Sequence, residues 1–293
     1  MNEFQIEHID LFNDWSNLIK TELDEQLFNT NGLNEDEISI LYFSNRKKII
    51  DPKKRTIFKS DIFNCPSEHQ LGLELIESKL TKGELLRPFQ SRQLKKLKTK
   101  DGLLFDWGIY HLHLGTEIQS DGFIERTGPL LYLIIDDFNA YFIDVLNHGE
   151  WTNQELLRII HRNWPQTIES SRIKGKGIVG LEKNFSDEEI NQLRRANVNV
   201  LIEIEPGVIY IGPGGGVAGN GQSAEAVNAY IENRNNLKRL EDQIIKNTSD
   251  FLKQVFTNLD FIKNKKLNFR MEKGLLSHEI LEVNNGFRII LNR

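Results

Sequence analysis

The stretch WGIYHLHL, residues 107–114, decides how the middle of this chain folds. Its aromatic and branched residues favour a β-strand. Alternate side chains of a strand lie on opposite faces, so Leu112 and Leu114 share one face, which we expect to be the core face. His111 and His113 share the other face. Imidazole is the side chain best suited to proton transfer near neutral pH, which makes this pair the first candidate for chemistry.

Further strands are predicted at residues 130–136 and 141–148, which are also rich in aromatic and branched residues. Turns that contain Gly or Asp separate the three segments, so we expect an antiparallel meander. Residues 154–162 read as a helix, with Thr152 as its N-cap and Pro165 as its stop.

The whole chain is predicted to be an α+β protein with a central antiparallel sheet domain. We place this domain at residues 67–168, where a helical pattern precedes the strands. An N-terminal helix and strand region occupies residues 1–66, and a C-terminal α+β domain occupies residues 169–293. The length of 293 residues allows more than one hydrophobic core, and 39% apolar residues are enough for a globular protein.

The N-terminal region combines one amphipathic helix with two strands. Apolar residues recur at helical spacing from Ile9 to Leu23. Residues 38–43 and 55–63 read as strands around a turn at Asp51-Pro52.

The C-terminal domain is organised around a glycine-rich loop, residues 212–221. A strand pair over residues 198–211 precedes this loop, and a long polar helix over residues 223–256 follows it. Residues 279–291 read as a closing strand. The loop contains the pattern G-x-G-x-x-G but lacks the Lys-Ser/Thr of a phosphate-binding loop. We therefore expect a flexible surface loop rather than a nucleotide cradle.

The composition also bears on where the protein works. The longest nearly apolar run, residues 128–135, is far shorter than the roughly 20 residues of a membrane helix. The acidic N-terminus lacks the basic and apolar segments of a secretion signal. The single cysteine, Cys65, cannot form an internal disulfide, which fits a reducing compartment. We expect a cytoplasmic protein that does not contact a membrane.

The charge is unevenly distributed along the chain. A net charge of −5 argues against nucleic-acid binding over the whole surface. Residues 87–100, here called the basic block, nevertheless contain six Lys or Arg residues and no acid. Such a block suits contacts with phosphates, although a solvated helix face has the same composition. The candidate substrate-binding residues in the block are Arg92, Lys95, Lys96 and Lys98.

Two further residues are expected near the histidine pair, because Arg126 precedes the second strand and His148 ends the third. RNA cleavage without a metal needs a base for the 2′-hydroxyl proton, an acid for the leaving 5′-oxygen and cations for the phosphorane charge. We assign His111 and His113 as general base and acid. Arg126 and His148 are assigned to the phosphate and the transition state. This chemistry requires no metal and no cofactor.

The order of elements from Pro88 to Pro165 resembles that of RelE- and HigB-like toxin ribonucleases. The resemblance rests on a Leu-Lys segment at residues 94–98, the histidine strand, Arg126 and the strand that ends at His148. It implies cleavage of messenger RNA, commonly on the ribosome, by a toxin or a defence-type effector. RNA, possible binding to the ribosome and a possible regulatory protein are the partners it implies. The long polar helix adds the possibility of a homodimer.

Two alternatives use the same residues differently. His-x-His on a strand can begin a metal site, with Asp144 or His148 as a further ligand of a metal-dependent hydrolase. The long flanking regions instead favour a non-catalytic protein-interaction module. His161 and Trp164, on the helix after the third strand, are expected on the same surface as the other candidates.

Overall fold

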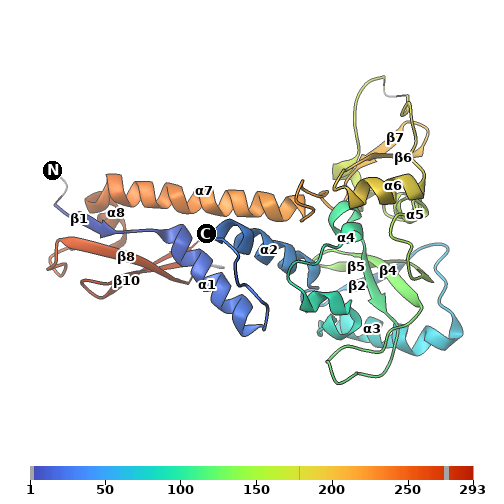
Figure 1. The fold of residues 1–293 in the computed structure, drawn as a ribbon, viewed down its shortest axis with the longest axis horizontal. Helices are drawn as coiled ribbons and strands as arrows, with labels where there is room; N and C mark the ends of the chain where they lie inside the picture. Colours follow the sequence, from blue (N-terminus) through green and yellow to red (C-terminus); the bar gives the residue numbers. More distant parts are fainter. Residues whose placement is uncertain (1–2, 178, 274–276, 293) are drawn as a thin grey trace. The chain divides into compact units, whose positions relative to one another are not determined.

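A computed structural model describes residues 3–177, 179–273 and 277–292 and shows an α+β fold (Figure 1). The chain forms two compact units. The terminal unit comprises Met1–Phe43 and Asn228–Arg293, and the central unit comprises Ser44–Val227. No helix among the described residues has the length and apolar character needed to cross a membrane.

The terminal unit contains a sheet in the order β1-β8-β9-β10, in which β1 runs parallel to β8 and the other neighbours are antiparallel. Helix α1 contacts β8 and buries Leu11, Trp15, Ile19 and Leu23 at helical spacing, which confirms the predicted stripe. The elements that lie wholly or partly in this unit are β1 (Gln5–His8), α1 (Leu11–Glu25), α2 (Glu35–Lys48), α7 (Ala224–Lys246), α8 (Thr248–Val255), β8 (Lys266–Lys273), β9 (Ser277–Glu282) and β10 (Phe287–Asn292).

The central unit is built on a sheet in the order β2-β5-β4-β3. Strands β3, β4 and β5 form the predicted antiparallel meander, and β2 adds a parallel strand beside β5. A β-hairpin, β6 and β7, lies apart from this sheet. The elements are β2 (Thr56–Lys59), α3 (Gln70–Lys82), α4 (Gly102–Trp107), β3 (Tyr110–His113), β4 (Pro129–Ile135), β5 (Asn139–Asn147), α5 (Glu155–Asn163), α6 (Asp187–Arg195), β6 (Leu201–Glu205) and β7 (Val208–Ile211).

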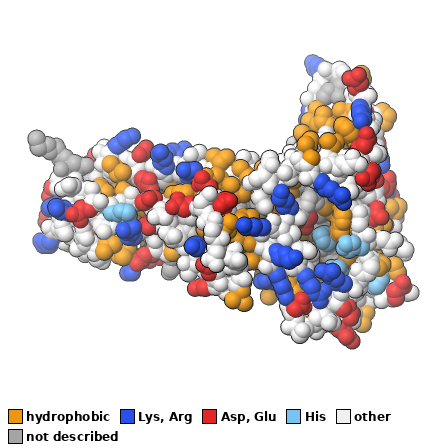
Figure 2. Space-filling model, in the orientation of Figure 1, with side chains coloured by type: hydrophobic (Ala, Val, Ile, Leu, Met, Phe, Trp, Pro, Cys, Tyr) orange, Lys and Arg blue, Asp and Glu red, His pale blue; other side chains and the backbone are white. Residues whose placement is uncertain are grey.

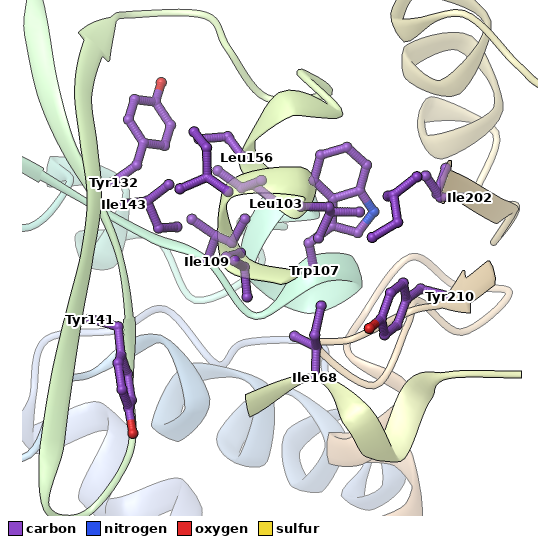
Figure 3. Close-up of a cluster of buried hydrophobic side chains, with 14 of the residues drawn as sticks. Leu103, Trp107, Ile109, Tyr132, Tyr141, Ile143, Leu156, Ile168, Ile202 and Tyr210 are labelled. Atoms are coloured by element: carbon purple, nitrogen blue, oxygen red, sulfur yellow. The ribbon is translucent and has the colours of Figure 1, made fainter. Parts of the chain in front are cut away.

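Both faces of this sheet carry a hydrophobic core. Leu112 and Phe142 pack with Ile76 of α3 on one face, as expected for the leucine side of β3. On the other face Tyr132 packs in a cluster with Trp107 of α4 and residues of α5, β6 and β7 (Figure 3). The face that carries the histidines is therefore largely covered, and only part of it is open to solvent.

Three predicted strands differ in the structure. Residues 38–43 lie within α2, because Asn34 and Glu37 cap its first turn through reciprocal side chain to backbone hydrogen bonds. The strand predicted over residues 55–63 is reduced to β2. The strand predicted over residues 107–114 begins only at Tyr110, because α4 occupies the residues before it.

Local capping explains where α4 lies. Asp101 caps its N-terminus by accepting a hydrogen bond from the Leu104 N–H at 3.0 Å. Gly108 ends the helix in the left-handed region, with φ of 74°. Thr152, by contrast, does not cap α5, whose N-cap is Gln154.

The C-terminal part also differs from the prediction in several places. The helix predicted over residues 223–256 is divided at Asn247 into α7 and α8. The closing strand over residues 279–291 is instead a hairpin of β9 and β10. The units also divide the chain differently from the predicted domains, since β2 pairs with β5 and residues 169–227 belong to the central unit.

The glycine-rich loop packs tightly against α4, so the prediction of a flexible surface loop is wrong. The N–H groups of Gly214 and Gly216 donate to the carbonyls of Asp106 and Phe105 at 2.8 and 2.9 Å. A Cβ on Gly214 would lie 2.2 Å from the nitrogen of Gly108. Glycine is required at this position because two backbones approach each other, and these two amides are not free to bind an anion.

Candidate functional site

A cavity of about 600 Å³ opens on the central unit beside the exposed end of the histidine face. Its lining combines histidines with several cations, and Asp101 is the single acid among the described lining residues. Figure 2 shows histidine side chains next to a group of Lys and Arg side chains on this unit. The basic, acidic and histidine residues of the wall are Lys48, Lys100, Asp101, His111, His113, Arg126, His148, Arg194 and Arg195.

All four predicted catalytic residues line this one cavity. His111 and His113 lie on β3, opposite Tyr132 and Leu130 of β4. Arg126 comes from the segment before β4, and His148 follows β5, with its N–H donating to the Gly128 carbonyl at 3.0 Å. The meander therefore brings together side chains that are far apart in the sequence, as the strand pattern predicted.

His113 is held in place by burial and by a hydrogen bond to the backbone. Its side chain is 5% exposed, and its Nδ1 accepts a hydrogen bond from the Thr127 N–H at 3.4 Å. Burial, together with the positive charges of His111 and Arg126, lowers the pKa of His113 to about 4. Neutral His113 therefore carries its proton on Nε2, since Nδ1 is the acceptor.

His111 differs in its hydrogen bonding. Its Nδ1 is buried and has no hydrogen-bond partner among the described residues. Burial lowers the pKa of His111, with a smaller contribution from His148, while Asp101 opposes the shift. A buried nitrogen without a hydrogen-bond partner is uncommon in folded proteins and is one mark of a functional site.

The Trp151 ring contacts the rings of two of the histidines. Its indole ring lies 4.8 Å from the His111 ring and 4.9 Å from the His148 ring, measured between centroids. Trp151 also lines the cavity. Trp151 was not among the residues predicted from the sequence.

Arg194 holds this part of the wall in place and was also missed. Its guanidinium donates to Asp106 Oδ2 through Nε at 3.0 Å and Nη2 at 2.7 Å, and through Nη1 to the Trp151 carbonyl. The guanidinium carbon also lies 4.5 Å from the centre of the Trp107 ring. The capping box of Ser186 and Glu189 predicts α6, yet nothing in the sequence places its last turn beside α4.

Lys48 is a further cation of the cavity wall that was not predicted from the sequence. It is 4% exposed, and its Nζ donates to the Thr99 carbonyl at 3.1 Å and the Leu97 carbonyl at 3.5 Å. Burial lowers the pKa of Lys48 to about 8, against the opposing effect of Asp101. An ammonium group that neutral carbonyls bind retains the ability to attract an anion into the cavity.

The predicted substrate-binding residues lie elsewhere. The basic block forms two short 3₁₀ turns, Arg87–Phe89 and Arg92–Lys95, instead of a continuous helix face. Asp121 forms ion pairs with Arg92 at 2.8 Å and with Lys95 at 3.2 Å. Arg92, Lys95, Lys96 and Lys98 are not part of the cavity wall.

Three other cations are better placed to bind an anion. Lys100, Arg126 and Arg195 are exposed, line the cavity and form no ion pair among the described residues. Lys100 is the only Lys or Arg of the basic block in the described wall of the cavity. Charge that is not neutralised by a neighbour contributes most to attracting an anionic ligand.

The remaining candidates do not join the site. His161 Nδ1 lies 2.8 Å from the Tyr210 hydroxyl, and the Trp164 ring packs 5.2 Å from that of Tyr141. Asp144 accepts hydrogen bonds from the Asn64 and Val145 N–H groups. Across residues 3–177, 179–273 and 277–292, no three His, Cys, Asp or Glu side chains are placed to hold a metal ion. The geometry therefore gives no support to a metal-dependent hydrolase.

The cavity combines three imidazoles, unpaired cations and an aromatic residue, which is a set of groups suited to a phosphate ester. Comparison with models of protein families, with curated proteins and with solved structures finds no match to this chain. The chemistry of the cavity is therefore the basis on which a function is proposed.

Proposed function

We propose that the central unit binds RNA in this cavity and cleaves a phosphodiester without a metal. The observation that carries the proposal is the convergence of His111, His113, His148 and Arg126 on one cavity. Neutral imidazoles can move protons at physiological pH, and cations can stabilise the phosphorane charge.

The proposed reaction is an internal displacement at phosphorus. The 2′-oxygen loses its proton to a base and bonds to phosphorus, while the bond from phosphorus to the 5′-oxygen breaks. An acid supplies the proton that the leaving 5′-oxygen takes up. The products are a 2′,3′-cyclic phosphate and a 5′-hydroxyl, and no oxidant or metal takes part.

The geometry changes the roles that the sequence suggested. His111 suits the base, because its Nδ1 has no competing partner. His113 presents Nε2–H, so it donates a hydrogen bond to a phosphate oxygen. His148 is the exposed imidazole among the three, so we assign it the acid role. Arg126 contributes a positive charge to the same phosphate.

The broader biological setting is part of the proposal. A toxin or defence-type effector that acts on RNA would need a regulatory protein partner to restrain it. Binding to the ribosome, homodimerisation and a cytoplasmic location stay predictions from the sequence. The resemblance to RelE- and HigB-like toxin ribonucleases also remains a prediction from the sequence.

A cleavage assay on cellular RNA, with and without ribosomes, tests the proposal. His111→Asn should lower the rate by roughly 10²–10⁴, the usual contribution of a general base. Leu112→Ala is the control from the opposite face of β3, where the side chain is fully buried. It should destabilise the fold by about 2–5 kcal/mol and lose activity only as folded protein is lost. Wild type that leaves all RNA intact would refute cleavage.

A non-catalytic module is the second candidate, and the low pKa of His113 favours it. A histidine with a pKa of about 4 is a poor proton carrier at neutral pH, although it donates well to an anion through Nε2. Such a module would bind a phosphate-containing partner in the same cavity. It predicts tight binding of RNA that remains uncut, and the assay above separates it from the enzyme.

A further inference from the structure

We infer that the RNA accepted by this cavity is single-stranded, and that one nucleotide leaves its stack to enter it. The inference rests on the proposed function and names its substrate class. It follows from the depth of the histidines, the geometry of the reaction, the position of Trp151 and the location of the exposed cations.

The depth of the reactive groups is the first argument. His113 is 5% exposed, and the reactive Nδ1 of His111 is buried. A phosphate on the outside of a duplex cannot reach these atoms while its ribose remains in the helix. The cavity holds about 600 Å³, which is room for a small ligand such as one nucleotide but not for a base-paired helix. The nucleotide must therefore be brought out of the stack, as enzymes that act on single bases do.

The geometry of the reaction also requires the nucleotide to leave its stack. The attacking 2′-oxygen must lie opposite the leaving 5′-oxygen across the phosphorus, because displacement proceeds in line. A regular A-form helix holds each ribose and phosphate in one fixed conformation that does not meet this condition. An unstacked nucleotide can rotate into it. A site that holds the nucleotide apart from its neighbours thus also supplies the reactive geometry.

Trp151 provides the surface that an unstacked base would meet. Trp151 lines the cavity, and contacts with the His111 and His148 rings restrict the orientation of its indole. The carbonyl of the same residue accepts a hydrogen bond from Arg194, which is itself paired with Asp106. A rigid aromatic ring binds any base through its flat face, so it favours single strands over a particular sequence.

Exposed cations of the cavity wall can bind the parts of the RNA strand that stay outside the cavity. Lys100, Arg126 and Arg195 belong to the cavity wall, and their side chains are open to solvent without an ion pair in the described part of the chain. Phosphates on either side of the entering nucleotide can contact them outside the cavity. The arrangement is one nucleotide inside and its neighbours on a cationic rim.

A substrate with one cleavable position tests the inference. The probe is a fluorescent DNA oligonucleotide that contains a single ribonucleotide, offered alone, paired with its complement, and paired with a strand that leaves the ribonucleotide in a bulge. The single strand and the bulge should be cut at similar rates, and the full duplex at least about 100-fold more slowly. Equal cleavage of the duplex and the single strand would overturn the inference while leaving RNA cleavage intact.

A binding measurement separates this inference from the proposed reaction. The all-DNA form of the probe cannot be cut, and fluorescence anisotropy gives its affinity as single strand and as duplex. Preference for the single strand, with competition by a nucleoside 3′-monophosphate, supports the inference even where no RNA is cut. Equal affinity for both forms, with no competition by the mononucleotide, would refute it.

Variants of Trp151 test the role of the ring. Trp151→Ala should weaken binding of the single-stranded probe by roughly 10- to 100-fold, and Trp151→Phe should restore most of it. Phe138→Ala is the matched control, because Phe138 is an aromatic residue outside the cavity wall that is 77% exposed. Its loss should leave affinity unchanged. An unchanged affinity in Trp151→Ala would exclude stacking on this ring.

Discussion

The Nδ1 atom of His113 accepts a hydrogen bond from the backbone N–H of Thr127, with 3.4 Å between the two nitrogens. A backbone amide always donates, so this contact selects the neutral tautomer with its proton on Nε2. Protonation of His113 would place a second hydrogen against the Thr127 amide. The same contact therefore orients the ring toward the cavity and opposes its positive charge.

Stability should depend on pH through His113. Burial holds its folded pKa at about 4, below the ordinary value of 6.5 that applies in the unfolded chain. The unfolded state then binds more protons between these values, so the free energy of unfolding decreases as pH falls from about 6.5 to 4. The His113 contribution to that decrease is up to about 3 kcal/mol. Urea unfolding at a series of pH values measures it.

His113→Asn is the control for this measurement. Its amide oxygen can still accept the hydrogen bond from Thr127, but the side chain does not titrate. The variant should lose the His113 part of the pH dependence and retain the part that His111 contributes. A pH profile identical to that of wild type would show that His113 is not held neutral by the fold.

Affinity for single-stranded RNA should depend on salt mainly through the cavity cations. Replacing Lys100, Arg126 and Arg195 with Gln removes three unpaired charges from the wall. The slope of log K against log salt concentration should become shallower by about 2, since each phosphate contact on a single strand contributes about 0.7. Filter binding at several salt concentrations provides the slope.

The basic block supplies a control with the same change in net charge. Replacing Lys95, Lys96 and Lys98 with Gln should alter the slope less, because these side chains lie outside the cavity wall and Lys95 is paired with Asp121. A larger effect of this triple variant would move the RNA-binding surface to the block, as the sequence alone suggested.

Two glycines of the same loop should respond very differently to alanine. A methyl group on Gly214 would lie 2.2 Å from the Gly108 nitrogen and 2.4 Å from the Leu104 carbonyl oxygen. Gly219→Ala meets no atom within 4 Å. We expect Gly214→Ala to destabilise by about 3 kcal/mol or more and Gly219→Ala by less than about 0.5 kcal/mol. Thermal melts of the two variants compare them directly, and equal melting temperatures would contradict the close packing of the loop on α4.

The contributions of Arg194 and Asp106 to the free energy of unfolding should depend strongly on each other. Both side chains are buried, at 8% and 4% exposure, so Arg194→Met leaves the Asp106 carboxylate without its partner. This single change should cost about 3–5 kcal/mol. Adding Asp106→Leu should recover part of that loss, because the unpaired charge is then removed. Additive losses in a double-mutant cycle would show that the two side chains do not depend on each other.

Much of the central sheet was predictable because its signals are local. Strand alternation placed Leu112 in the core and both histidines on the opposite face, and the turns that contain Gly or Asp implied the meander. The same reasoning brought His148 to the site, since consecutive antiparallel strands bring their ends together. The start of α6 is equally local, because Ser186 and Glu189 form a capping box within four residues.

Other features depend on contacts that no local pattern encodes. Arg194 meets Asp106 across 88 positions of sequence, and Lys48 meets the Thr99 carbonyl across 51. The acidic Asp121 neutralises part of the basic block only because the chain returns beside it. In α2 the capping signal of Asn34 and Glu37 was present in the sequence but the apolar run after it was read as a strand.

The most direct test of the central claim is the chemistry of the cut ends. RNA cleaved by the wild-type protein in the presence of EDTA, analysed by mass spectrometry, should carry a 2′,3′-cyclic phosphate on one fragment and a 5′-hydroxyl on the other. A 2′-O-methyl group at the cut position should abolish cleavage, because no 2′-hydroxyl remains to attack. Fragments with a 3′-hydroxyl and a 5′-phosphate, or cleavage of the methylated strand, would contradict histidine-mediated internal displacement at this cavity.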